Sequence, residues 1–136
     1  MNPSLITSEN LSLDLLKGIF DAAFVDYSFS SKGHLLVNEE IQIWVNPNRE
    51  HKDRITLCCF FTLESGVSEI ARLQAANQMN ANLVAIRTYI TGEQIVFEWD
   101  IPVAGGISPK ALILAIKKFA SIPLVAGRIY GQGIIR

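Results

Sequence analysis

Residues 70–108 constrain the fold of this 136-residue chain most strongly. They read IARLQAANQMNANLVAIRTYITGEQIVFEWDIPVAGGIS. The pattern predicts a helix, then a hairpin formed by Leu83–Ile90 and Gln94–Ile101, then a glycine turn that leads into another helix. The short connections favour an antiparallel pairing of the strands.

The helix that begins this stretch has a polar position in its apolar stripe. Ile70, Leu73 and Asn77 recur at spacings of three and four residues, and Asn80 lies nearby. A buried amide needs hydrogen-bond partners, because an unsatisfied one costs about 1–3 kcal/mol. We therefore expect Asn77 and Asn80 to bond the backbone where helix meets strand, in preference to holding a ligand.

The hairpin and the following turn contain the other polar residues of this stretch. Pairing about a turn at Thr91-Gly92 places Arg87 across from Val96 and diagonal to Glu98, within reach of a salt bridge. Ser108 precedes a proline and should cap the last helix. Gly105-Gly106 should form a tight turn before it, although a flexible turn beside a helix start could hold an anion.

The remaining elements complete an α+β pattern. A helix is expected around Leu13–Ala23, followed by strands at Leu35–Asn38, Ile41–Asn46 and Arg54–Leu63. Pro123 should kink the last helix or restart it from Ser121. The predicted order is α-β-β-β-α-β-β-α, a two-layer sandwich with helices on one face of a five-stranded antiparallel sheet. We expect one domain over residues 1–136, with residues 131–136 frayed.

Composition narrows the class of protein. Hydrophobic residues make up 49% and charged residues 18%, and the net charge of −1 gives no reason to expect nucleic acid. Residues 1–100 carry a net charge of −6 and residues 101–136 carry +5, most simply because a basic last helix packs beside acidic residues of its own domain. A basic surface for an acidic partner is the alternative.

The expected location is cytoplasmic. The start MNPSLITSEN lacks the features of a secretory signal, and no apolar run approaches the ~20 residues that a membrane helix needs. Cys58 and Cys59 are adjacent, so their side chains should lie on opposite faces of a strand as reduced thiols. Neither these cysteines nor His34 and His51 have the spacing of a metal site.

No catalytic constellation can be assembled from this sequence. Glu39-Glu40 near His34 is the best candidate, but adjacent residues of a strand point opposite ways and cannot form a carboxylate pair. Nucleophile-elbow, zinc-protease and phosphate-loop motifs are absent from the sequence. We therefore expect no catalytic, cofactor-binding or metal-binding residues, and no enzymatic activity.

One face of the sheet has the composition of an interface. If helices cover the opposite face, this one collects aromatic and charged side chains, which are typical of protein contacts. A half-exposed sheet face with scattered apolar residues is the simpler alternative. We interpret the face as an interface, with a second copy of the chain preferred over a foreign protein. Its candidate residues are Trp44, Phe60, Tyr89 and Val96.

The stretch also resembles the YbjN-like family of proposed bacterial sensory transduction regulators. The resemblance rests on five short segments: Asn77-Gln78-Met79-Asn80, Arg87-Thr88-Tyr89, Thr91-Gly92-Glu93, Glu98-Trp99-Asp100 and Gly105-Gly106-Ile107-Ser108. Met79 stands where the family has tryptophan, and the hairpin turn lacks the family's aspartates. The resemblance implies a fold like that of type III secretion chaperones, a homodimer, and protein binding without enzymatic activity.

Two functions follow as hypotheses. The first is a non-enzymatic interaction module, a regulator or adaptor that binds itself and an unidentified protein, with no nucleic acid, membrane or cofactor. The second is a small-molecule or nucleotide sensor, or an enzyme, that uses the Gly105-Gly106 turn or a pocket between the last helix and the sheet.

Overall fold

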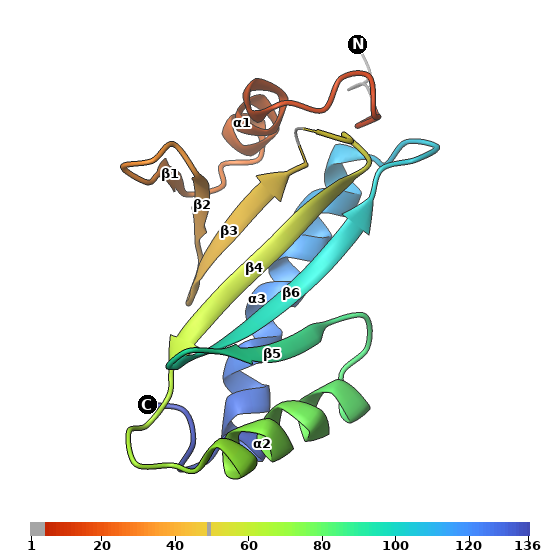
Figure 1. Cartoon of the computed structure of the whole chain (residues 1–136). Coiled ribbons are helices and arrows are strands. Elements are labelled where there is room, and N and C mark those ends of the chain that lie inside the picture. Colours follow the sequence, from red (N-terminus) through yellow and green to blue (C-terminus); the bar gives the residue numbers. More distant parts are fainter. Residues whose placement is uncertain (1–4, 49) are drawn as a thin grey trace. The chain divides into compact units, whose positions relative to one another are not determined.

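The computed structural model describes residues 5–48 and 50–136 (Figure 1). The protein is α+β, and its strands form a six-stranded antiparallel sheet in the order β1-β2-β3-β4-β6-β5. The elements in chain order are α1 (Leu13–Ala22), β1 (Tyr27–Phe29), β2 (Leu35–Asn38), β3 (Gln42–Pro47), β4 (Arg54–Thr62), α2 (Glu69–Asn82), β5 (Arg87–Thr91), β6 (Gln94–Pro102) and α3 (Pro109–Tyr130).

The expected number of five strands is wrong by one. The missed strand, β1, has only three residues, none of them fully buried, so it carries almost no alternation signal. Its place in the sheet comes from pairing with β2, where Ser28 lies opposite Leu36. The arrangement of the helices in one layer on one face stays a prediction.

The chain divides into two compact units. The first unit comprises Met1–Leu57 with Asp100–Ala120, and the second comprises Cys58–Trp99 with Ser121–Arg136. The boundary therefore falls inside β4, β6 and α3, and each unit takes part of all three elements.

In the first unit, two capped helices and the strands β1 to β3 supply the core. Ser12 accepts a hydrogen bond from the amide of Leu15 at 3.0 Å, and Ser108 accepts one from Ala111 at 3.0 Å, so the predicted cap of the last helix is confirmed. The ammonium group of Lys117 lies 2.6 Å from Glu39, which joins the basic last helix to an acidic segment of its own unit. The fully buried or nearly buried helix residues are Leu16, Phe20, Leu112, Ile116 and Phe119.

In the second unit, the turn of the β5–β6 hairpin lies one residue later than predicted, which shifts the pairing register by two residues. Thr91 pairs with Gln94, which leaves Gly92 and Glu93 as the loop, and Gly92 has the positive φ of 57° that this turn requires. Arg87 consequently lies directly opposite Glu98 instead of diagonal to it. A slip of two residues keeps every side chain on its predicted face, so the apolar pattern alone could not reveal it.

The predicted buried face of α2 is wrong. Ile70 is 69% exposed and Leu73 is 50% exposed, and Asn77 is exposed beside them. The buried residues lie on the neighbouring face of the helix and are Arg72, Ala75, Ala76 and Met79. An arginine and two alanines carry little apolar signal, so the stronger pattern of Ile70 and Leu73 pointed to the wrong side.

The helix α3 runs unbroken past Pro123, so the predicted restart at Ser121 does not occur. Proline has no amide hydrogen, and the helix tolerates the loss of one hydrogen bond there. The segment after α3 is bonded to the end of β4 and to the residues that follow it. The backbone amide of Glu64 donates to the carbonyl of Ile134 at 2.7 Å, and the backbone amide of Arg136 donates to the carbonyl of Thr62 at 2.9 Å.

Candidate interaction surfaces

Alternate residues of β4, β5 and β6 place a mixed aromatic and polar face on the second unit. We call it the Glu98 face. In β5 and β6, Arg87 lies opposite Glu98 and Tyr89 lies opposite Val96, so all four side chains share one side of the hairpin. Its residues are Cys58, Phe60, Arg87, Tyr89, Val96 and Glu98.

Glu98 organises this face. Its carboxylate accepts a hydrogen bond from the guanidinium of Arg87 and another from the hydroxyl of Tyr89. The bond to Glu98 raises the pKa of Tyr89 to about 12, with smaller contributions from burial and from the negative charge. The predicted pair of Arg87 and Glu98 is therefore present, and Tyr89 is held in place by the same carboxylate.

The four predicted interface residues differ in what they offer a partner. Phe60 is 42% exposed and Tyr89 is 40% exposed, so both present aromatic surface. Val96, opposite Tyr89 in the hairpin, is buried and adds little exposed area. Trp44 belongs to the first unit, where it is half-buried and its ring centre lies 5.1 Å from that of His34.

Both cysteines are free, as predicted. Burial raises the pKa of Cys58 to about 11, with a further contribution from the charge of Glu98. Burial raises the pKa of Cys59 further still. Because the thiolate is the nucleophile, these two side chains are poorly suited to covalent catalysis near neutral pH.

Asn80 joins α2 to β5 in the predicted way. Its side-chain amide donates to the carbonyl of Thr88 at 2.9 Å and accepts from the amide of Thr88 at 2.7 Å. The hydroxyl of Thr88 donates in turn to the carbonyl of Ala76 at 3.0 Å. Asn77, expected to share this role, lies on the exposed side of the helix instead.

Sequence reasoning missed Arg72, the charged residue on the buried side of α2. Its guanidinium donates to the carbonyl of Glu64 and to the carboxylate of Glu93, each at 2.9 Å. The hydrogen bond and the positive charge lower the pKa of Glu93. The Nε of Arg72 is buried without a partner among the described residues. Arg72 thus fixes the start of α2 against the hairpin turn.

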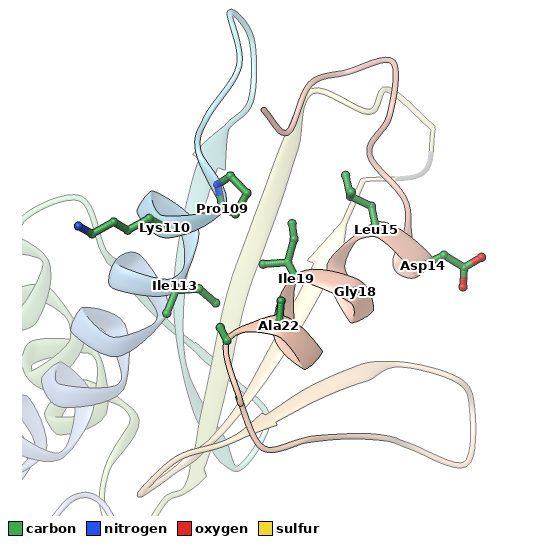
Figure 2. Close-up of a pocket in the computed structure, with 9 residues that line it drawn as sticks. Asp14, Leu15, Gly18, Ile19, Ala22, Pro109, Lys110 and Ile113 are labelled. Atoms are coloured by element: carbon green, nitrogen blue, oxygen red, sulfur yellow. The ribbon is translucent and has the colours of Figure 1, made fainter. Parts of the chain in front are cut away.

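A groove in the first unit runs between α1 and the start of α3 (Figure 2). It has a volume of about 540 Å³, and most of its lining is apolar. Figure 2 shows Asp14 and Lys110 pointing outward on opposite sides of it. The residues that line it are Asp14, Leu15, Gly18, Ile19, Ala22, Ala23, Pro109, Lys110 and Ile113.

The Gly105-Gly106 turn lies just before this groove in the chain and does not line it. Both glycines have positive φ angles, 79° and 87°, as the predicted tight turn requires. A side chain at Gly106 would meet Leu5 at 2.9 Å, and the flanking Ile6 and Ile107 pair as a β-bridge. The N-terminal segment therefore packs against the turn.

A second cavity, of about 630 Å³, lies in the second unit between the end of α3 and β4. Phe61, Pro123 and Leu124 give it apolar walls, and Arg128 and Arg136 contribute two guanidinium groups. This combination suits a small ligand with an apolar body and an anionic group.

Within residues 5–48 and 50–136, no three His, Cys, Asp or Glu side chains converge as metal ligands. Over the same residues, no helix has the length and hydropathy of a membrane span. The expected absence of a metal and of a membrane partner stays a prediction.

Comparison with known proteins gives two matches. The sequence pattern of the YbjN family, described as "Putative bacterial sensory transduction regulator", matches residues 12–123. The crystal structure of YbjN from E. coli, described as "a putative transcription regulator", has a similar fold with a TM-score of 0.75 at 12% identity. The likeness covers 98% of this chain and 99% of that one. No curated protein matches the sequence.

Proposed function

The chain belongs to the YbjN family, and we propose that it is a non-enzymatic interaction module, a regulator or adaptor of the cytoplasm that binds a protein partner through the Glu98 face. The observation that carries this proposal is the exposure of Phe60 and Tyr89 around a glutamate fixed by two hydrogen bonds. Tyrosine, phenylalanine and arginine are enriched at protein interfaces, and aromatic anchors held in place lose little entropy on binding.

The thiols support the same proposal. Cys58 lies on the Glu98 face as a free thiol whose pKa is raised by burial, which makes it a poor nucleophile near neutral pH. An acidic or basic catalyst would need a group poised to exchange protons near neutral pH. The raised pKa of Tyr89 and the raised pKa of Cys58 both move these groups away from that range.

The test is capture of a partner by the tagged full-length chain and two matched variants. Phe60→Arg places a charge on the Glu98 face, whereas Val84→Arg places the same charge at an exposed apolar residue of the α2–β5 loop. The proposal expects a stoichiometric protein that is retained by the wild type and by Val84→Arg and is lost with Phe60→Arg. Equal retention by all three, after equal melting temperatures, would contradict it.

The cavity between α3 and β4 favours a second candidate function, the sensing of an anionic metabolite. A thermal-shift screen against nucleotides and carboxylate metabolites separates the two candidates, because a ligand that binds the folded state raises its melting temperature. A large shift that Arg128→Gln abolishes would favour sensing. No shift across the screen, together with a captured protein, would favour the interaction module.

A further inference from the structure

The helix α1 ends in a backbone conformation that glycine adopts easily and a residue with a large side chain adopts rarely. The amide of Val25 donates to the carbonyl of Phe20 at 2.9 Å and the amide of Phe24 donates to that of Asp21 at 3.3 Å, the two bonds of a Schellman motif. That motif places the residue after the C-cap in the left-handed region, where glycine is usual. Here the residue is Phe24, with φ of 56°.

The Phe24 side chain gains nothing from its own chain to offset this strain. Its exposed fraction is 96%, the largest of any large hydrophobic residue described. An exposed phenylalanine in a position suited to glycine is a strained feature with no structural benefit in the monomer. Such features persist where the surface has a function.

The groove between α1 and α3 begins beside this residue, because Ala23 lines it and precedes Phe24 in the chain. A small ligand fits this groove poorly. Pockets for small molecules place a few polar groups toward the ligand, but the two charged residues of this groove point away from it (Figure 2). An apolar groove with charges outside it suits a macromolecule whose apolar side chains fill it.

The charges on the two sides are complementary to each other. Asp14 lies on the α1 side and Lys110 on the α3 side, and neither forms an ion pair with another described residue. Two copies can face each other groove to groove, related by a two-fold axis that runs along the groove. In this arrangement α1 of one copy lies over α3 of the other. Each Asp14 then approaches Lys110 of the second copy, so the surface is complementary to itself.

We propose that the groove between α1 and α3 is the contact surface of a symmetric homodimer, in which Phe24 of each copy fills the groove of the other. This inference rests on the proposed function, since it names one partner of the interaction module as a second copy. It assigns self-association to the first unit, in place of the sheet face for which the sequence favoured a second copy, and leaves the Glu98 face of the second unit for a different protein.

The decisive variant is Phe24→Gly, because glycine suits the backbone at this position and removes only the ring. Sedimentation equilibrium of the full chain should show a dimer, and Phe24→Gly should weaken it about thirtyfold, as expected for loss of an aromatic anchor. The matched control, Val84→Gly, also removes an exposed apolar side chain but should leave the dimer unchanged. Lys110→Asp should weaken the dimer and Asp14→Lys with Lys110→Asp should restore it.

A chain that is monomeric at all concentrations would overturn this proposal, and so would a dimer that Phe24→Gly leaves intact. If that dimer is instead disrupted by Phe60→Arg, the Glu98 face is the dimer contact. Saturable binding of an aliphatic carboxylate to the groove of a monomer, abolished by Ile113→Glu, would also overturn it in favour of a small ligand. The partner-capture experiment is scored separately, so a retained partner in any of these cases keeps the proposed function.

Discussion

The two surfaces of this protein differ in how their side chains are held. On the Glu98 face, two hydrogen bonds to one carboxylate fix Arg87 and Tyr89 before any partner arrives. In the groove of the first unit, apolar side chains line an open space, and the neighbouring Phe24 is 96% exposed. Preorganised polar groups therefore suit specific recognition of a distinct partner, whereas an unfilled apolar groove suits a partner that supplies apolar side chains.

The substitution with the greatest predicted cost in stability removes the hydrogen bonds between Asn80 of α2 and Thr88 of β5, the strand that carries Arg87 and Tyr89 of the Glu98 face. Asn80→Ala removes both bonds to the backbone of Thr88 and leaves a part-buried amide and carbonyl unpaired, so it should destabilise the protein by about 2–3 kcal/mol. Urea denaturation checks this value. Asn77→Ala is the matched control and should cost under about 0.5 kcal/mol, because exposed substitutions rarely cost more. Equal costs for the two variants would remove the assigned role of Asn80.

A substitution in the first unit should raise the free energy of unfolding instead of lowering it. Phe24→Gly relieves the left-handed strain at the end of α1 and should stabilise the monomer by about 1 kcal/mol. Thermal unfolding under dilute conditions, where self-association is negligible, is the measurement. A fall in stability would mean that the Phe24 ring packs against its own unit.

The pKa of Cys58 tests whether the charge of Glu98 acts on its neighbours in the Glu98 face. Its raised pKa, about 11 against an ordinary 9.0, favours the neutral thiol in the folded state. The corresponding stability is therefore present below pH 9 and is lost as the pH rises to 11. The rate of alkylation of Cys58 in Cys59→Ser should follow a midpoint near 11. Glu98→Gln should lower this midpoint, and an unchanged midpoint would show that burial alone is responsible.

The smallest expected effect concerns the pair of Arg72 and Glu93. Arg72 lowers the pKa of Glu93, so the pair stabilises the folded state at neutral pH, and this stability is lost as the pH falls below the ordinary value of 4.5. Glu93 itself is largely exposed, so water screens the interaction. Comparing the acid unfolding of the wild type with that of Glu93→Gln should show a shallower loss in the variant. Identical acid profiles would argue against the pair.

The sequence predicts the buried side of an element where apolar side chains recur regularly. It fails to predict that side where a hydrogen-bonded polar residue occupies a buried position. Apolar alternation marks the buried side of β4, and helical spacing marks the buried side of α3, where Leu112, Ile116 and Phe119 lie. The buried face of α2 could not be found, because Arg72 occupies a core position through hydrogen bonds to distant residues. Only the folded chain shows those partners.

The candidate surfaces were partly predictable for the same reason. Strand alternation placed Phe60, Tyr89 and Glu98 together, and pairing of Arg87 with Glu98 followed from opposite charge on one face. The groove could not be predicted, because Ile19 and Ile113 are distant in sequence and read as ordinary helix positions. The strain at Phe24 is likewise invisible until the φ angle is known.

Hydrogen–deuterium exchange across a dilution series separates the roles of the two surfaces, since it reports both at once. Association should protect residues 13–24 and 109–113 as the concentration rises, with residues 87–98 unchanged until a foreign partner is added. Protection of residues 87–98 on self-association, with none at 13–24, would contradict the assignment of separate surfaces to the two partners.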